Sequence, residues 1–262
     1  MLEILPLLSQ VALAVFIYMS LFYIISLIIK RTDIVDIGWG LGFILVALVS
    51  LLTQEYLTDR IILVFFLVLF WGLRLASHIY SRNKGKEEDY RYQQFRKEWG
   101  DTFYIRSYFQ IFLLQGLFML IVSLPIIFIS HFSISPLGYI DLIGVLVWIT
   151  GFVIESTADS QLKKFIERKR EGKTETRFAD IGLWKYSRHP NYFGEILQWW
   201  GIGIVALSVS FGYVSLLGPL FISYLIIFVS GIPLLEKRFE KDPEWNEYVN
   251  RTRKLLPFPK YK

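Results

Sequence analysis

Long apolar runs constrain this chain more than any other feature of its sequence. A run of about 18–25 apolar residues can cross a bilayer as a helix, which satisfies its own backbone hydrogen bonds. Seven runs predict an all-α polytopic membrane protein: Leu5 to Ile29, Gly38 to Thr53, Ile61 to Ile79, Tyr108 to Ser130, Leu137 to Ser156, Phe193 to Val209 and Phe211 to Leu235. The second and sixth runs are short, and the last two are barely separated, so six spans are the alternative.

Composition agrees with a membrane protein and excludes several other classes. Of the 262 residues, 54% are hydrophobic and 19% are charged, whereas soluble domains have about 45–50% and about 25%. There is no cysteine, which excludes thiol catalysis, thiolate zinc sites and iron–sulfur clusters. The polar segments between the runs are too short to fold independently, so we expect residues 1–262 to form one transmembrane domain.

The distribution of basic residues predicts the orientation. With seven spans, all of the 28 Lys and Arg residues except Arg60 and Arg74 lie on one side of the membrane. Basic loops stay in the cytoplasm, which predicts an external N-terminus and a cytoplasmic C-terminus. This asymmetry, together with attraction to anionic lipid, also accounts for the net charge of +5. No nucleic-acid partner is expected, and the oligomeric state is not indicated.

Ionisable side chains near the span ends are the first candidates for a site. Each costs about 2.5–3.5 kcal/mol at the centre of a membrane helix, so its presence needs an explanation. Residues three or four apart share a helix face, and three pairs have that spacing: Asp33 with Asp36, Arg74 with His78, and Glu155 with Asp159. All are expected at cytoplasmic span ends, which predicts one polar cavity. The alternative is ion pairs that only hold helices together.

The segment Gly182 to Glu195, GLWKYSRHPNYFGE, contains the densest group of polar candidates. Pro190 suits the first turn of a helix, which puts Arg188 and His189 just before a helix N-terminus. Such an end attracts anions, so the pattern favours a cofactor that carries phosphate or carboxylate. An interfacial aromatic belt is the alternative, but it leaves the polar residues unexplained. The three histidines are far apart in sequence, so no metal site is expected.

The polar tail that follows the last run is amphipathic. It reads EKRFEKDPEWNEYVNRTRKLLP from Glu236 to Pro257. One interpretation is a helix lying on the inner leaflet. In the other, Arg238 and Tyr248 close over a bound cofactor.

Four segments together resemble a known superfamily. They are GLWKYSRHPNYFGE, the tail ending EYVNRTRKLLPF, WGLRLASHIYSRNKGKEEDYRY from Trp71 to Tyr92, and DIGWGLGF from Asp36 to Phe43. They resemble the steroid 5-alpha-reductase superfamily and, within it, a bacterial branch. The resemblance runs from about residue 33 to the end and is most specific over 108–262.

The resemblance implies a seven-helix reductase of a bacterial plasma membrane. Such enzymes bind NADPH from the cytoplasmic side and reduce a C=C bond conjugated to a carbonyl, here in a lipophilic or steroid-like molecule taken from membrane lipid. Glu195 matches the family glutamate beside the nicotinamide, and Asn191 the nearby asparagine. The resemblance implies further cofactor contacts at Arg74, Asp159, Arg177, Arg238 and Tyr248, alongside Arg188 and His189 from the helix N-terminus.

One departure concerns the group that polarises the substrate carbonyl. In the steroid reductases this group is a tyrosine shortly before the span-three arginine, whereas this chain has Trp71 there. An indole N–H donates a hydrogen bond but does not transfer a proton. An acid is then needed to stabilise the enolate oxygen, and Asp36 is the candidate, with Asp33 as the alternative.

A second resemblance supports a different chemistry. The Arg-His-Pro-x-Tyr string at Arg188 is similar to isoprenylcysteine and phospholipid methyltransferases, which bind S-adenosylmethionine and have an acid after the last span. Glu236 is the candidate for that acid. A non-catalytic lipid-binding membrane protein is the third alternative.

Overall fold

A computed structural model describes residues 2–259, and within them every regular element is a helix. The described residues contain six helical segments long and apolar enough to cross a membrane: Leu5–Ile29, Ile34–Leu52, Asp59–Asn83, Tyr90–Val122, Tyr139–Arg170 and Gly212–Lys237. The all-α polytopic class is therefore confirmed. The run expected at 193–209 forms α9 (Pro190–Ala206), which has 17 residues and is shorter than these segments. Seven spans and their orientation stay predictions.

The chain divides into two compact units, which we describe separately. The first comprises Met1–Asp141 and Val205–Gly218, and the second comprises Leu142–Ile204 and Pro219–Lys262. The single transmembrane domain expected from the sequence stays a prediction.

The first unit is built around helices that approach closely at glycine. Its helices are α1 (Leu5–Ile29), α2 (Ile34–Leu52), α3 (Asp59–Asn83), α4 (Tyr90–Trp99), α5 (Phe103–Ser107), α6 (Leu114–Val122) and α7 (Leu124–Phe132). A Cβ on Gly40 of α2 would lie 2.7 Å from the Gly72 carbonyl oxygen of α3, and one on Gly72 would lie 2.6 Å from the Gly40 oxygen. The two backbones therefore pack at a distance that only glycine permits.

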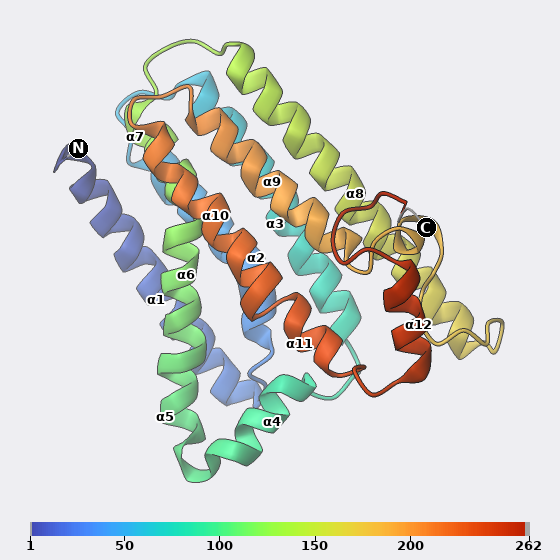
Figure 1. Cartoon of the computed structure of the whole chain (residues 1–262). Coiled ribbons are helices and arrows are strands. Elements are labelled where there is room, and N and C mark those ends of the chain that lie inside the picture. Colours follow the sequence, from blue (N-terminus) through green and yellow to red (C-terminus); the bar gives the residue numbers. More distant parts are fainter. Residues whose placement is uncertain (1, 260–262) are drawn as a thin grey trace. The chain divides into compact units, whose positions relative to one another are not determined.

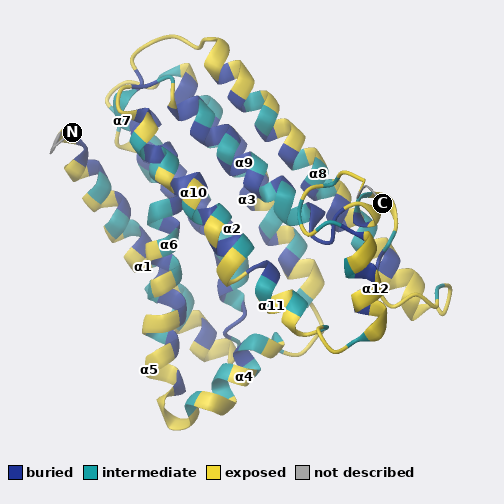
Figure 2. Cartoon of the chain, in the orientation of Figure 1, coloured by how far each residue is buried: buried dark blue, intermediate teal, exposed yellow. Residues whose placement is uncertain are grey.

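The outer surface of α1 is apolar. Buried residues recur every fourth position, at Leu7, Val11, Val15 and Met19, while Leu13 and Ile28 are 60% and 74% exposed. Figure 2 shows the exposed positions of this helix in yellow. A helix that is apolar on both its buried and its exposed side suits a lipid environment.

A buried ion pair joins two distant segments of the first unit. The Arg60 guanidinium donates to both carboxylate oxygens of Asp141, from Nε at 2.7 Å and from Nη2 at 2.9 Å. Arg60 also donates to the hydroxyl of Ser133 and to the carbonyl of Pro136. The charge of Arg60 is thereby matched, as a charge buried at a span end requires.

Two runs that look continuous in sequence are interrupted. The run 108–130 contains a π-helical segment, Tyr108–Leu113, and α6 ends before Ser123 and Pro125. The run 211–235 contains η5 (Gly212–Leu216), α10 (Leu217–Tyr224), a second π-helical segment (Leu225–Val229) and α11 (Ile232–Lys237). Pro125 lies at the second of these breaks in the first run, and Gly231 and Pro233 lie where α11 begins, whereas the segment Tyr108–Leu113 contains neither residue type.

The second unit is organised by α8 (Tyr139–Arg170) and α9, with α12 (Pro243–Arg251) in the tail. Figure 1 shows α8 and α9 running side by side. The apolar run ends near Ser156, but α8 continues to Arg170, with basic residues in its last turn that favour the helix C-terminus. A Cβ on Gly194 of α9 would lie 2.6 Å from the Gly151 carbonyl oxygen of α8, so glycine again permits close packing.

Candidate functional site

The predicted site residues are divided between the two units. Asp36 with its alternative Asp33, Trp71 and Arg74 belong to the first unit, and the other candidates belong to the second.

Asp36, in the first turn of α2, is held by two side chains of α4. Its Oδ2 accepts from Arg91 Nη2 at 2.6 Å, and its Oδ1 accepts from the Tyr92 hydroxyl at 2.6 Å. Arg91 also pairs with Asp89 at 2.9 Å. Both carboxylate oxygens of the predicted catalytic acid therefore have strong donors, and the buried Tyr92 hydroxyl lies directly against it.

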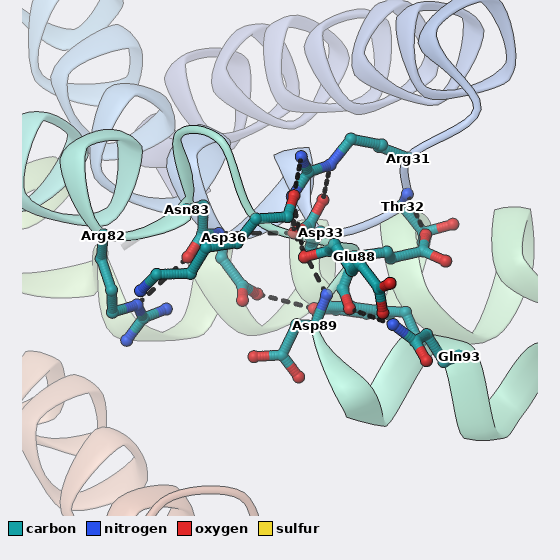
Figure 3. A network of polar contacts seen from close by, with 12 residues as sticks. Arg31, Thr32, Asp33, Asp36, Arg82, Asn83, Glu88, Asp89 and Gln93 are labelled. Carbon is teal, nitrogen blue, oxygen red and sulfur yellow. Dashed lines mark hydrogen bonds and ion pairs between the residues drawn. The ribbon is translucent and has the colours of Figure 1, made fainter. Parts of the chain in front are cut away.

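Asp33, the alternative acid, is held by the same part of the chain. Arg31 donates to it from Nε at 3.0 Å and from Nη2 at 2.7 Å, and Asn83 Nδ2 donates at 3.4 Å (Figure 3). The hydrogen bond that Arg31 donates to the Asp33 carboxylate raises the pKa of Arg31. We call this group the acid–guanidinium network; it consists of Asp33, Asp36, Glu88 and Asp89 with Arg31, Arg91 and Arg96.

The pKa of Asp89 shows how the network balances burial against charge. Burial alone would raise the pKa of this carboxyl, but the hydrogen bond and charge of Arg91 lower it below its ordinary value. Asp89 is thus held as a carboxylate. The network joins the α1–α2 turn to α4 through matched charges.

Trp71 and Arg74 lie three residues apart on α3. Trp71 is 2% exposed, and its ring meets Phe43 of α2 edge to face, with centroids 5.5 Å apart. Arg74 is half-buried. Their roles toward substrate and cofactor stay predictions.

In the second unit, α8 and α9 bring acids and side-chain amides together. Asn191 Nδ2 donates to Asp159 Oδ1 at 3.3 Å, and Gln198 Nε2 donates to Glu155 Oε2 at 2.6 Å. We call these four residues the acid–amide face. Glu155 and Asp159 are both buried, as their four-residue spacing on one helix allows.

Gln198 has one polar atom that the described residues leave unsatisfied. Its Nε2 donates to Glu155 and, at 3.3 Å, to the Gly194 carbonyl, which fixes the orientation of the amide. The Oε1 atom is buried and accepts no hydrogen bond from any residue in the described range, and the side chain is 1% exposed. A buried unsatisfied acceptor costs about 1–3 kcal/mol, so it marks a place where a donor from a ligand would be stabilised.

Glu195 shares the helix with both amides. It lies one turn after Asn191 and is half-buried. Asn191, Glu195 and Gln198 follow one another at intervals of four and three residues, which places them on one side of α9.

A second cluster joins the start of α9 to the tail; we call it the Glu236 cluster. Glu236 Oε1 accepts from Arg188 Nε at 2.8 Å and lies 3.0 Å from His189 Nε2. Arg188 Nη1 also donates to the Thr252 carbonyl at 2.7 Å. Arg188 and His189 are therefore buried contacts to the tail, and their predicted role toward a cofactor phosphate stays a prediction.

Burial controls the protonation of His189. Desolvation lowers its pKa below the ordinary value, against the opposing effect of the Glu236 hydrogen bond. The imidazole is therefore neutral near pH 7. With the carboxylate of Glu236 as acceptor, the proton of the neutral ring lies on Nε2.

The remaining predicted residues lie in and around the tail. The Tyr248 hydroxyl donates to the Trp184 carbonyl at 2.6 Å, and burial raises its pKa. Arg177 is exposed and pairs with Asp242 at 2.8 Å. The Arg238 guanidinium lies 5.7 Å from the centre of the Phe239 ring.

Four partners were missed by sequence reasoning: Arg91, Tyr92, Gln198 and Asp242. Gln198 had a usable signal, because it follows Glu195 by three residues on the same helix. The others are far in sequence from the groups they contact. In the described range, no three His, Cys, Asp or Glu side chains lie close enough together to hold a metal ion.

The fold and these polar groups define an integral, multi-pass, all-helical membrane protein. The chain belongs to the family described as protein of unknown function (DUF1295), whose model matches residues 22–252. This family is steroid 5-alpha-reductase-like, which confirms the resemblance to that superfamily; the bacterial branch and the relation to methyltransferases stay predictions.

Individual relatives support the same relationship. Human 3-oxo-5-alpha-steroid 4-dehydrogenase 1 is 31% identical over 140 residues, covering 50% of this chain and 48% of the relative. A steroid 5-alpha-reductase of Gossypium hirsutum is 33% identical over 73 residues, covering 28% and 27%. An uncharacterised protein of Schizosaccharomyces pombe is 24% identical over 257 residues, covering 89% and 74%.

The chain thus spans about half the length of the human and macaque reductases. No solved structure matches the chain.

Proposed function

We propose that this protein is an NADPH-dependent membrane reductase that reduces a carbonyl-conjugated C=C bond in a lipid or steroid-like molecule. Family membership and the steroid reductases among its relatives support this reaction class. The observation that carries the proposal for this chain is the acid–amide face. It contains the pair Asp159–Asn191, which the resemblance assigns to the cofactor, and the unsatisfied acceptor of Gln198.

The residues of the second unit fit the cofactor chemically. A nicotinamide ring carries a carboxamide, whose N–H groups suit the buried Gln198 Oε1 and whose carbonyl suits an amide donor such as Asn191. Arg177, exposed in the loop after α8, supplies a cation for phosphate. When bound, NADPH would supply a hydride to the β-carbon; the enolate oxygen would then need a hydrogen-bond donor, and a proton at the α-carbon would complete the reduction.

The chain itself has to orient the cofactor and supply that proton. Glu195 is the candidate catalytic group on α9, beside the amides. In the first unit, Asp36 and Trp71 are the candidates for stabilising the enolate oxygen. Both Asp36 oxygens already accept hydrogen bonds, from Arg91 and from the Tyr92 hydroxyl, so Tyr92 would serve the enolate oxygen only by turning its single O–H away from Asp36.

One observation favours a second function. The methyltransferase resemblance pairs the Arg-His-Pro string with an acid after the last span, and Arg188 and His189 both contact Glu236. Under this alternative the Glu236 cluster binds S-adenosylmethionine. The third alternative, a non-catalytic lipid-binding protein, requires neither cofactor.

Thermal shift of the detergent-purified protein separates these functions when NADPH and S-adenosylmethionine are tested side by side. We expect NADPH alone to raise the midpoint, because a ligand that binds only the folded state stabilises it. Screening enone lipids for loss of reduced-nicotinamide absorbance then tests turnover. A shift with S-adenosylmethionine alone contradicts the reductase, and a shift with neither, in protein shown to be folded, supports the non-catalytic alternative.

Arg177→Ala tests the loop assignment. We expect its affinity for NADPH to fall about tenfold, because a charge-assisted contact to phosphate is lost. Lys173→Ala is the matched control, since Lys173 is an exposed cation of the same loop, paired with Glu171. Equal affinity in both variants would remove Arg177 from the cofactor site.

A further inference from the structure

A cavity in the first unit has none of the predicted site residues in its lining. It has a volume of about 260 Å³ and lies where α1 ends, against α4 and α5. Its lining includes Ser26, Lys30, Thr32, Arg96, Phe103 and Ser107. This volume is slightly below the lower end of small-molecule pockets, about 300 Å³, so it suits a headgroup better than a whole lipid.

Two cations line this cavity. Lys30 is exposed, and no described residue forms an ion pair with it. Arg96 donates hydrogen bonds to the Glu88 carboxylate from Nε at 3.3 Å and from Nη2 at 3.1 Å, but its Nη1 has no acceptor among the described residues. Glu88 also accepts from the Thr32 backbone N–H at 2.6 Å, which holds the Arg96–Glu88 pair in place; the net positive charge of the cavity therefore comes from Lys30, and Arg96 contributes its remaining donor, Nη1.

The hydroxyl groups add a second kind of contact. Thr32 Oγ1 accepts from Arg96 Nη2 at 3.4 Å, which leaves its own O–H to donate. The Ser26 and Ser107 hydroxyls already donate to the Tyr23 and Tyr104 carbonyls, so their oxygens can accept. Cations with one hydroxyl donor suit a phosphate, while the two serine acceptors suit ligand hydroxyl groups.

Apolar surface continues from the cavity along the helices that form it. On α1, Ile24 is 50% and Ile28 is 74% exposed, and Leu27 itself lines the cavity. On α5, Tyr104 and Ile105 are 54% and 69% exposed (Figure 2). The polar groups thus lie at the end of a membrane-spanning helix, with surface for acyl chains beside them.

We propose that this cavity binds the hydroxyl-bearing phosphodiester headgroup of an anionic phospholipid, with Lys30 and Arg96 on the phosphate and Ser26 and Ser107 on the hydroxyls. The acyl chains lie along the exposed apolar face of α1. This site is independent of the proposed function, because neither cation belongs to the predicted cofactor or catalytic residues.

Binding to the full-length purified protein tests the site with three probes. These are dioctanoyl phosphatidylglycerol, dioctanoyl phosphatidylcholine and glycerol 3-phosphate, each titrated in a detergent that lacks phosphate. We expect the anionic lipid to bind at least about tenfold more tightly than either of the others. If glycerol 3-phosphate binds as tightly as phosphatidylglycerol, the ligand is a soluble phosphate compound and not a membrane lipid, which contradicts the proposal. Equal affinity for the two lipids also contradicts it.

Substitutions at Lys30 locate the site. Lys30 has a left-handed backbone, with φ of 56°, and asparagine tolerates this conformation, so Lys30→Asn removes the charge without added strain. We expect it to weaken phosphatidylglycerol binding about tenfold, whereas Lys30→Arg keeps the affinity. Lys97→Gln is the matched control, because Lys97 is an exposed cation of α4 outside the cavity. Equal loss in Lys97→Gln, or none in Lys30→Asn, overturns the proposed site.

Discussion

The acid–guanidinium network and the acid–amide face begin from similar sequence patterns but differ in their partners. Asp33 and Asp36 are three residues apart, and Glu155 and Asp159 are four apart. In the first unit these acids meet Arg31 and Arg91, whereas in the second unit they accept from the neutral amides of Gln198 and Asn191.

The difference teaches what each pair is suited to do. A guanidinium supplies parallel donors and a full charge, which locks a carboxylate in place. An amide supplies a donor and also an acceptor, and in Gln198 that acceptor is left unsatisfied by the described residues. The first arrangement thus suits a structural joint, and the second suits a ligand site.

Removal of Arg91 should cause the largest loss of stability. Arg91→Met leaves Asp36 and Asp89 without their shared cation. Breaking a fully buried pair costs about 3–5 kcal/mol; because Arg91 is 30% exposed, we expect about 2 kcal/mol in the free energy of unfolding. Denaturant titration in detergent measures it.

Arg82→Met is the control for this prediction. Arg82 is exposed, and among the residues that the structure describes it donates only to Asn83, at 3.2 Å. Its loss should change the free energy of unfolding by less than about 0.5 kcal/mol. Equal effects of the two substitutions would mean that the network is not a structural joint.

Gly194→Ala should cause the next largest loss of stability. It tests the acid–amide face, as Arg91→Met tests the acid–guanidinium network. The new methyl group would lie 2.6 Å from the Gly151 carbonyl, so α8 and α9 must separate. We expect a loss of about 1–2 kcal/mol and weaker NADPH binding, because the acid–amide face spans the two helices. Gly138→Ala, where nothing lies within 4 Å of the added Cβ, should leave both properties unchanged. If Gly194→Ala bound NADPH with the affinity of the wild type, the spacing of α8 and α9 would not matter for cofactor binding, which would contradict this prediction.

The smallest effect concerns the pH dependence of the Glu236 cluster. The pKa of His189 is lower in the folded protein than in the unfolded chain. As the pH falls below about 6.5, the unfolded chain takes up a proton that the folded protein resists, so stability decreases. The thermal midpoint of the wild type should therefore fall more between about pH 7.5 and about pH 5 than that of His189→Gln, which has no titrating group there. If the thermal midpoints of the wild type and His189→Gln fall equally over this pH range, the titration of His189 does not contribute to the pH dependence of stability.

Hydropathy was sufficient to predict the fold class and most of the membrane-crossing segments. It did not predict that α8 continues to Arg170, because a polar helix beyond the bilayer has no apolar signal. Nor did it reveal the π-helical segments, because both lie inside predominantly apolar runs.

For the candidate site, local spacing was informative and distant contacts were not. The four-residue spacing put Glu155 and Asp159 on one face of a helix, and the structure shows that both are buried on α8. The Tyr92–Asp36 contact joins residues 56 apart in sequence, and no periodicity encodes it. Arg188 looked like an anion-binding cation, but only the fold shows that Glu236 and the Thr252 carbonyl accept from its guanidinium.

The central claim is that the acid–amide face, and not the acid–guanidinium network, holds the cofactor. Two asparagines provide a matched test: Asn191 donates to Asp159 at 3.3 Å and Asn83 donates to Asp33 at 3.4 Å, and both are half-buried. Calorimetric titration of NADPH into the wild type, Asn191→Ala and Asn83→Ala should show affinity about tenfold weaker in Asn191→Ala only. Unchanged affinity in Asn191→Ala, or an equal loss in Asn83→Ala, would contradict the account.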